Sequence, residues 1–593
     1  MKRRVADIIM DVLVENGITD CFAVVGGGAM YLDNALLHQP KLNKYFNHHE
    51  QACAMAAESY ARVSGRMPLV CVTSGPGGTN TLTGVMGAYV DSIPMIVISG
   101  QVRYAISVPK SGLKLRTRGV QEFNIVDTVK TMTKYSKLVT DPMDIKMEIQ
   151  KALRIAMSGR RGPVWLDIPQ DVQSIQVDED ALRDYIPEET ERSIIDLSAL
   201  HEALRIAERP VFLAGAGIVS TNSRALFRAL IEKTHIPAVS SLSATNVLYR
   251  DHELCFGPVG PCGQRSANII IQNSDLIISV GCSLGFQVTG FSQDTFAPGA
   301  KLIAVDIDEQ ELKKPGLSYE LRYVSDVVDF MQCMLDSEYN IPFRKQWIQY
   351  CHDIKARFSP YEAAAGKQPD DRVCAYVFWE NYYKKAPEDE VLVLGNNSAI
   401  TSALQIGNYL KNQNTYVNFN CGSMGYDLPA AIGASVALGR EVALVTGDGS
   451  FMMNLQELQT IAHHQLPIKI LLFENQGYNA IRQTSKTFFN GEMIGCTPES
   501  GVSFPSFKKV ADAFGIAYMK CGKNRELPAC LEQVFQADGP VIMEISQLID
   551  DPVSPKVMSR ADENGVMLSP ALHDMYPFIP KEVLKGLMIG QEG

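Results

Sequence analysis

The feature that constrains the fold most is the stretch 441–478, in which two short apolar runs flank a helical pattern. The first run, 442–445, leads into the sequence GDGS (447–450), and the second, 468–473, leads into ENQGY (474–478). Between them, apolar residues recur every three or four positions, as they do on one face of an amphipathic helix. The pattern predicts a strand–helix–strand unit. Its glycine turn lies at the carboxyl end of the first strand, where open α/β sheets bind ligands.

The residues at these two strand ends suit a phosphate and a cation. Glycine at position 449 lets a ligand approach the backbone closely, and the free N–H groups at a helix start attract phosphate. Asp448 would repel that phosphate unless a cation lay between them. Asn475 follows the neighbouring strand. Its amide oxygen, the Asp448 carboxylate, a carbonyl near Gly477 and diphosphate oxygens would together suit an octahedral Mg²⁺. The alternative is an ordinary turn between a strand and a helix.

The GDGS turn with Asn475 at this distance resembles the cofactor motif of thiamine diphosphate (ThDP) enzymes. The resemblance extends over nearly the whole chain to the acetolactate-synthase-like members of that family. It implies an α/β fold with three doubly wound parallel-sheet domains. These are a pyrimidine-binding domain over residues 1–185, a central domain over 196–336, and a diphosphate-binding domain with a C-terminal tail over 371–593. Alternating strand and helix patterns in the first domain favour the same architecture. We interpret the tail as either a lid or surface packing.

Composition narrows the class of protein. The chain has 593 residues, which is enough for several domains. Its net charge of −11 argues against binding to nucleic acid or to an anionic membrane surface. The 13 cysteines include no CxxC pair, which favours reduced thiols in a cytoplasmic protein. Acidic residues interrupt the apolar positions of the N-terminal segment, so we expect an amphipathic helix there and not a signal peptide.

Glu50 begins a predicted helix of small residues behind a strand end. By position alone it is a carboxylate favoured by the helix dipole, a contribution of about 0.3–1 kcal/mol. However, the strings HHEQACAMAAESYARVSG (48–65) and VTSGPGGTN (72–80) resemble the pyrimidine-binding domain of ThDP enzymes. The resemblance implies that Glu50 is catalytic and binds the cofactor. In the family, the matching glutamate bonds the aminopyrimidine ring and promotes the imino tautomer that deprotonates the thiazolium carbon.

Two other features of the first domain could lie near the reacting atoms. Gly27 and Gly28 either let the backbone approach a substrate carbonyl or its oxyanion, or form a plain turn. Gln121 resembles a family glutamine that lies near the reacting carbon. The loop before it, 101–118, is basic and either attracts an anionic substrate or is simply solvated; its cations include Lys110, Lys114, Arg116 and Arg118.

The resemblance also implies cofactor contacts in the third domain. The sequence GNNS (395–398) resembles the first diphosphate loop, in which Asn397 and Ser398 can donate hydrogen bonds. Met424 matches the bulky apolar residue that holds ThDP in its bent shape, although taken alone it would be read as core. In the GDGS motif and the stretch after it, the implied cofactor or metal positions are Asp448, Gly449, Ser450, Asn475, Gly477 and Tyr478.

The central domain resembles the family domain that holds FAD in acetolactate synthases and is empty or holds other nucleotides in other members. The glycines of GAG (215–217) are a weak indication of a dinucleotide site. The sequence GCSLG (281–285) lacks the arginine expected one or two positions after its last glycine in flavin-binding members. The sequence therefore favours a protein without tightly bound FAD, but does not exclude one.

The acceptor side departs from the family pattern. In acetolactate synthases a tryptophan in the region after Gly477 helps select the acceptor, and this chain has no tryptophan there. We expect Ile481 and Arg482 to face the acceptor. The resulting hypothesis is a transferase or lyase that decarboxylates a 2-oxoacid, such as pyruvate. It would then join the remaining acyl unit to a second carbonyl compound that is larger or more polar, such as a keto-sugar.

Two other hypotheses stay open at this point. One is a ThDP-dependent hydrolase or lyase that cleaves a C–C bond of a diketone or acyloin. The other is a non-catalytic subunit, against which the presence of Glu50, Asp448 and Asn475 argues. In this family the Glu50-type residue reaches across a subunit interface, so the resemblance implies a homodimer or a homotetramer.

Overall fold

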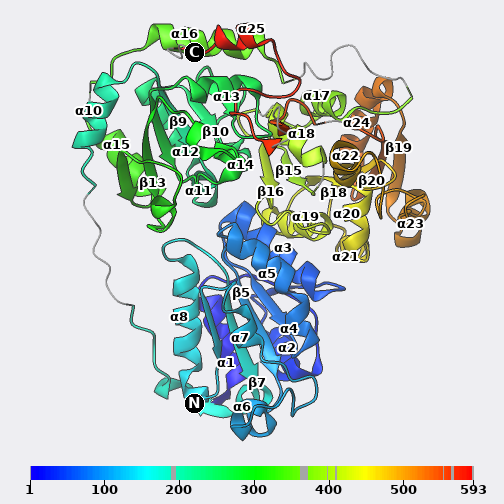
Figure 1. Ribbon diagram of the computed structural model, residues 1–593. Coiled ribbons are helices and arrows are strands. Elements are labelled where there is room, and N and C mark those ends of the chain that lie inside the picture. Colours follow the sequence, from blue (N-terminus) through cyan, green and yellow to red (C-terminus); the bar gives the residue numbers. More distant parts are fainter. Residues whose placement is uncertain are drawn as a thin grey trace.

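The computed structural model describes residues 2–187, 195–338, 340–360, 371–396, 398–407, 410–551, 553–561 and 567–589. Within these ranges the chain forms three six-stranded sheets in which every neighbouring pair of strands is parallel. Figure 1 shows the first domain at the bottom, the central domain at the upper left and the third domain at the upper right. The prediction of three doubly wound α/β domains is confirmed. No helix in the described ranges has the length and apolar character that a membrane span requires.

The first domain has the strand order β3-β2-β4-β5-β7-β6. Its strands are β2 (Asp20–Ala23), β3 (Asn43–Phe46), β4 (Leu69–Val72), β5 (Ile96–Gln101), β6 (Tyr135–Leu138) and β7 (Val164–Pro169). The main helices are α1 (Val5–Glu15), α2 (Met30–His38), α3 (Glu50–Ser64), α5 (Leu82–Val90), α7 (Ile125–Val129) and α8 (Ile145–Met157). The order reverses between β2 and β4, so a crevice is expected beyond the carboxyl ends of these two strands.

The central domain has the strand order β11-β10-β9-β12-β13-β14, which is the order of dinucleotide-binding sheets. Its strands are β9 (Pro210–Ala214), β10 (Ala238–Ser240), β11 (Cys255–Pro258), β12 (Leu276–Val280), β13 (Lys301–Asp306) and β14 (Leu321–Val324). The helices include α10 (Ser198–Ile206), α11 (Ala216–Ser220), α12 (Arg224–Thr234), α13 (Arg265–Gln272), α15 (Val327–Asp336) and α16 (Lys345–Arg357).

The third domain repeats the connectivity of the first, with the order β16-β15-β17-β18-β20-β19. Its strands are β15 (Val391–Leu394), β16 (Asn414–Val417), β17 (Val442–Gly447), β18 (Ile468–Glu474), β19 (Ala517–Cys521) and β20 (Val541–Ser546). The helices are α17 (Ala375–Lys385), α18 (Ser398–Ile406), α19 (Asp427–Leu438), α20 (Asp448–Phe451), α21 (Glu457–His464), α22 (Asn479–Phe488), α23 (Phe507–Phe514) and α24 (Leu527–Gln536). Here the strand order reverses between β15 and β17, so the GDGS turn lies at the switch point.

The first and third domains meet through α3 and α19, whose small residues allow close approach. At Gly433 a Cβ would lie 1.9 Å from the carbonyl oxygen of Ala56, so only glycine fits at this crossing. Close to it, the hydroxyl of Tyr426 donates to the buried carboxylate of Glu58. The two domains therefore share one continuous apolar core.

The described part of the tail after Asp551 packs on the central domain and ends in α25 (Lys581–Lys585), which lies beside α16 in Figure 1. Leu572 and Leu587 belong to the core cluster of that domain. The buried Arg265 of α13 donates to the carbonyl of Pro577 (2.7 Å). Of the two interpretations of the tail, the structure therefore supports surface packing for the described part.

Candidate functional site

The turn after β17 brings a buried carboxylate against the end of β18. Asp448 Oδ1 accepts from the N–H of Gly449 (2.7 Å), and Oδ2 accepts from the N–H groups of Asn475 (2.9 Å) and Gly477 (3.3 Å). Burial raises the pKa of Asp448 to about 6, although these N–H donors favour the charged form. The two strand ends that the sequence pairs are thus in direct contact.

Glycine is required at two positions around this turn. A Cβ at Gly449 would lie 2.2 Å from the Tyr478 ring and 3.2 Å from the Met424 methyl group. At Gly477, φ is +147°, and a Cβ would lie 2.0 Å from the carbonyl oxygen of Cys496. Met424 and Tyr478 therefore both lie against the GDGS turn.

The first predicted diphosphate loop lies at the same edge of the sheet. The N–H of Gly395, directly after β15, donates to the Val445 carbonyl (2.8 Å), and the side chain of Asn396 donates to the Gly422 carbonyl. Ser450 Oγ accepts from the N–H of Gly425 (2.9 Å), which holds the two loops together. Of the two expected donors, Asn397 lies outside the described residues, and Ser398 is described only as the first residue of α18.

The structure corrects one sequence expectation on the acceptor side. Ile481 is 45% exposed, as expected of a residue that faces a substrate, but Arg482 is only 2% exposed. Its guanidinium points inward and donates to the carbonyl oxygens of Asn475 (3.1 Å) and Ile549. A signal for this was present in the sequence. Arg482 stands three positions from both Asn479 and Ser485, so all three share the inner face of α22.

Asn475 is held from its other side by Gln547, a fully buried residue that sequence reasoning missed. Asn475 Nδ2 donates to Gln547 Oε1 (3.0 Å), and Gln547 Nε2 donates to Asp551 (3.1 Å). The Asn475 amide therefore presents its oxygen away from Gln547. Gln547 follows directly after β20, and only the pairing of β20 with β18 brings it close.

The residues present fit a ThDP diphosphate with its cation. The described residues contain no cluster of three His, Cys, Asp or Glu side chains that could hold a metal on their own. A cation here would instead take one carboxylate (Asp448), one amide oxygen (Asn475) and a backbone carbonyl, with the remaining positions left to phosphate oxygens. The buried, N–H-bonded carboxylate beside a glycine cradle matches that donor set.

Glu50 begins α3, and its Oε2 accepts from Asn80 Nδ2 (2.9 Å). The other oxygen, Oε1, lies 3.7 Å from the position of a Cβ on Gly77. Among the described residues, no hydrogen bond or ion pair joins Glu50 to the turn at Asp448. One chain thus presents the two halves of the candidate site at separate places.

The turn after β2 is occupied by internal hydrogen bonds, which changes the role expected for Gly28. Its N–H donates to Thr73 Oγ1 (2.9 Å), so it is not available to a substrate oxyanion. The carbonyl oxygen of Gly27 accepts from Gln170, and Gly27 itself is exposed. At Gly28 the structure therefore favours a plain turn over a site for a substrate oxyanion.

Gln121 lies at the end of the basic loop, with φ of +58°, and its carbonyl oxygen lies 2.4 Å from the position of a Cβ on Gly75. The neighbouring Glu122, which sequence reasoning passed over, closes this loop. Its carboxylate accepts from the N–H groups of Val108 (2.6 Å) and Gly119 (2.8 Å). The loop is therefore folded back on itself, and Lys110, Lys114, Arg116 and Arg118 are exposed.

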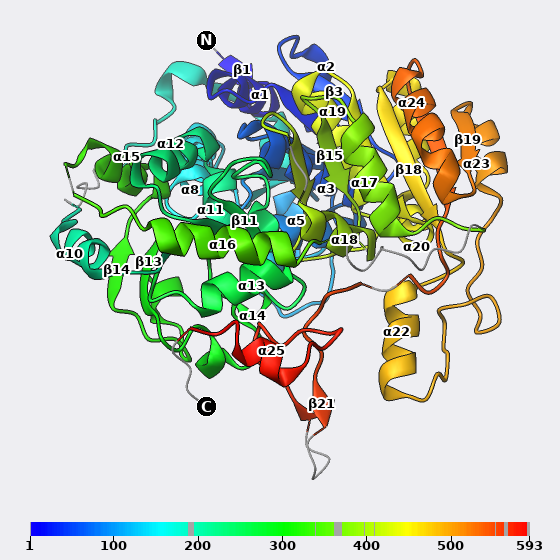
Figure 2. The same ribbon diagram turned by 90° about the horizontal axis from the view of Figure 1, so that it is seen from above.

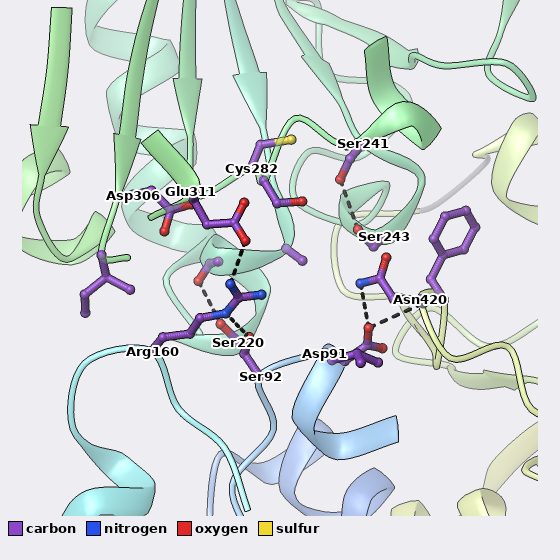
Figure 3. A pocket seen from close by; sticks show the side chains of 18 of the residues that line it. Asp91, Ser92, Arg160, Ser220, Ser241, Ser243, Cys282, Asp306, Glu311 and Asn420 are labelled. Atoms are coloured by element: carbon purple, nitrogen blue, oxygen red, sulfur yellow. Dashed lines mark hydrogen bonds and ion pairs between the residues drawn. The ribbon is translucent and has the colours of Figure 1, made fainter. Parts of the chain in front are cut away.

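A cavity of about 450 Å³ lies where all three domains meet, and Figure 3 shows side chains that line it. Arg160 of the first domain donates to Asp308 (3.1 Å) and Glu311 (2.6 Å) of the central domain. Asp91 accepts from the side chain of Asn420 of the third domain (2.7 Å). The predicted nucleotide-domain sequences 215–217 and 281–285 border the same cavity.

The arginine side chains that line this cavity are already paired with acceptors of the protein itself. Arg62 pairs with Glu58 and with Asp91 (2.6 Å), and Arg161 donates to the Ser220 carbonyl (3.0 Å). Together with Arg160, these are the three arginines of the lining, and each has a protein acceptor. The loop after Gly285 continues with Phe286 and Gln287, so it supplies no arginine of its own.

Comparisons with known proteins agree over most of the chain. Three family models of thiamine pyrophosphate enzymes match: the N-terminal TPP binding domain at residues 3–127, the central domain at 197–334 and the C-terminal TPP binding domain at 396–545. The acetolactate synthase large subunit of Corynebacterium glutamicum is 32% identical over 94% of this chain and 88% of its own length. The acetolactate synthase isozyme 2 large subunit of Escherichia coli is 31% identical over 91% and 95%, and the chloroplastic acetolactate synthase of Arabidopsis thaliana is 30% identical over 95% and 84%.

Proposed function

The chain belongs to the thiamine-diphosphate-dependent, acetolactate-synthase-like enzymes. From that premise we propose that it decarboxylates a 2-oxoacid, with pyruvate as the donor, and joins the acyl unit to a carbonyl acceptor that is larger or more polar than a simple 2-oxoacid. The family assignment makes the chain a ThDP-dependent carboligase of the transferase type. The donor and acceptor are our proposal.

The observation that carries the proposal is the contact between Asp448 and the Asn475–Gly477 backbone at the switch point of the third sheet. We assign Asp448, Asn475 and the Gly477 carbonyl to Mg²⁺, and the N–H groups of the GDGS turn to the diphosphate. When bound, ThDP supplies an electron sink for the carbon that loses CO₂. The protein's part is to fix that cofactor, with Met424 and Tyr478 packed against the turn.

Glu50 is assigned to the aminopyrimidine end of the cofactor, where its carboxylate would hold or move a proton. The only hydrogen bond to this carboxylate among the described residues comes from Asn80. The carboxylate is therefore held in position, and its other oxygen can still bond the cofactor. Because one chain presents Glu50 and Asp448 separately, we propose that two copies share each site. The enzyme would then be at least a homodimer.

The proposed acceptor follows from the surroundings of α22, which stands away from the third domain in Figure 2. The region after Gly477, which carries a tryptophan in acetolactate synthases, has none in this chain, and its helix offers the exposed Thr484 and the exposed Ile481. A smaller, polar side chain leaves room for hydroxyl groups. The exposed cations of loop 101–118 would favour an acceptor that carries phosphate, such as a phosphorylated or nucleotide-linked keto-sugar.

We also propose that the central cavity holds no permanent FAD. A flavin dinucleotide brings a diphosphate, and the three lining arginines are already bound to protein acceptors. Asp306 and Glu311 add negative charge to the same walls. The purified enzyme should therefore show no flavin absorbance.

The test is CO₂ release from pyruvate with ThDP and Mg²⁺, measured with and without candidate carbonyl acceptors and followed by product analysis. We expect release that rises when a polar keto compound is added, together with a product that contains both carbon skeletons. No release from any 2-oxoacid would contradict the proposal. If the enzyme instead cleaves a C–C bond of a diketone or acyloin and releases no CO₂, it is a ThDP-dependent hydrolase or lyase.

A further inference from the structure

We infer that Arg482 is a positioning residue: it fixes the amide of Asn475 for cation binding and ties that amide to the start of the C-terminal tail. Nη2 of its guanidinium donates to the Asn475 carbonyl (3.1 Å), to Asn475 Oδ1 (3.4 Å) and to the Ile549 carbonyl. Nη1 donates to the Cys496 carbonyl (3.4 Å). One planar cation thus gathers three chain segments around a single amide.

The guanidinium is buried among carbonyl oxygens from three segments of the chain. Arg482 is 2% exposed, and Nη1 lies 2.8 Å from the position that a Cβ on Gly477 would occupy. Its charge is offset by Asp550, whose Oδ1 lies 3.5 Å from Nε. A buried cation that donates to backbone carbonyls stabilises the loop in one arrangement. Its removal would take a donor from the carbonyls of Asn475 and Ile549, whereas the Cys496 carbonyl would still accept from the N–H of Tyr478 (3.0 Å).

The side chain of Asn475 is therefore locked from both ends. Gln547 takes its Nδ2 donor, and Arg482 lies against its Oδ1. An amide oxygen has two lone pairs, so Oδ1 can accept from Arg482 and still offer a lone pair to a metal. Outer groups that orient a metal ligand in this way typically change metal affinity by about 10- to 100-fold when they are removed.

The connection continues into the tail. Asn479, one turn before Arg482 on α22, donates to the Asp551 carbonyl (2.8 Å), and the Asp551 carboxylate accepts from Gln547 (3.1 Å). The segment 549–551 is thus bound to the same loop that carries Asn475. Its continuation packs on the central domain, so the cation loop and the tail are held in place together.

Lys486 provides a matched control. It lies one turn further along α22 and pairs with the same Asp550 (2.6 Å), but it is exposed and makes no contact with Asn475. A variant at Lys486 alters the charge of the helix and the ion pair with Asp550. It leaves the contacts of Arg482 with the three carbonyls intact.

This inference rests on the proposed cation site, so the experiment separates the two. We would titrate Mg²⁺ into the full-length enzyme at saturating ThDP and follow the melting temperature and near-UV circular dichroism for the wild type, Arg482→Met, Arg482→Lys and Lys486→Met. If the wild type shows no Mg²⁺-dependent response to ThDP, the proposed cation site fails, and the inference fails with it.

If the wild type responds, we expect Arg482→Met to need about 10- to 100-fold more Mg²⁺. Arg482→Lys should lie between it and the wild type, and Lys486→Met should match the wild type. At saturating Mg²⁺ the KM for pyruvate should be unchanged in the variants. Wild-type Mg²⁺ affinity in Arg482→Met would overturn the role of Arg482 and leave the proposed cation site standing. If that variant does not fold, wild-type affinity in Arg482→Lys overturns it.

Discussion

At the scale of single residues, the third domain buries carboxylates at both edges of its sheet, with different consequences. Asp448 lies at the carboxyl edge and accepts three backbone N–H bonds, which favour the charged form that we propose to bind the cation. Glu390 lies at the opposite edge, just before β15, and accepts from the N–H of Ala443 (3.1 Å). Burial and the neighbouring charge of Glu441 raise the pKa of Glu390 to about 8. We assign the first carboxylate to the proposed cation site, whereas we expect the second to affect stability alone.

Glu390 should make the enzyme less stable as the pH rises. The folded state binds its proton more tightly than the unfolded state, whose glutamate has a pKa near 4.5. The loss of stability therefore begins above pH 4.5, grows until about pH 8 and is constant beyond it. Glu390→Gln should match the wild type in acid and exceed it in alkali by a few kcal/mol, since each pKa unit is worth about 1.4 kcal/mol.

Urea denaturation at a series of pH values would measure this difference. The exposed Glu388 offers a matched control, because Glu388→Gln removes a carboxylate from the same loop without removing a buried one. Parallel pH profiles for Glu390→Gln and the wild type would contradict the assignment.

Glu50→Gln tests the proposed proton role. The amide keeps the size of the side chain and can still pair with Asn80, so the cofactor should still bind. Because general acid–base groups typically contribute about 10²- to 10⁴-fold, we expect turnover to fall by that range. Stopped assays of CO₂ release would measure it, with ThDP-dependent thermal stabilisation as the control for loading. A variant that turns over like the wild type would remove Glu50 from the catalytic group.

At the scale of elements, the sequence predicts strand ends better than it predicts what surrounds them. The apolar runs before Asp448 and Asn475 are local signals, and the two strands end within two residues of the ends of these runs. Gln547 and the inward turn of Arg482 depend on the pairing of β18 with β20 and on the loop near Cys496. Such contacts join residues far apart in the sequence, so periodicity alone does not reveal them.

A substitution at the crossing of α3 and α19 tests how closely these two helices pack. Gly433→Ala places a Cβ 1.9 Å from the Ala56 carbonyl oxygen, a backbone atom that cannot retreat without moving α3. Overpacking of this kind costs about 1–3 kcal/mol, more than the gain of about 1 kcal/mol in helix propensity. We expect a lower melting temperature by calorimetry. Gly299→Ala, where a Cβ meets no atom within 4 Å, should leave it unchanged. An unchanged Gly433→Ala would show that the helices can separate.

At the scale of the whole molecule, the first and third domains repeat one strand order, and each has its own switch point. The connectivity β3-β2-β4 matches β16-β15-β17, and each carries half of the candidate site. Sequence resemblance gives three domains and implies a shared site, but the cavity where all three domains meet could not be predicted. Its walls include Arg160 and Asn420, which lie far apart in the sequence and approach only through domain packing.

A shared site can be tested by mixing two inactive variants. In a two-fold dimer, each site takes Glu50 from one copy and Asp448 from the other. A dimer of one Glu50→Gln chain and one Asp448→Asn chain therefore has one site with both substitutions and one site with neither. Each variant alone should be nearly inactive, whereas co-expression in equal amounts should restore about a quarter of wild-type activity, because half of the dimers are mixed and each has one intact site. The measurement is CO₂ release from the unfractionated mixture. Mixed dimers isolated through different tags on the two chains should have about half of wild-type activity, because one of their two sites is intact. Activity no higher than that of the separate variants would mean that Glu50 and Asp448 of the same chain act together, and that the two halves meet by domain motion within one copy.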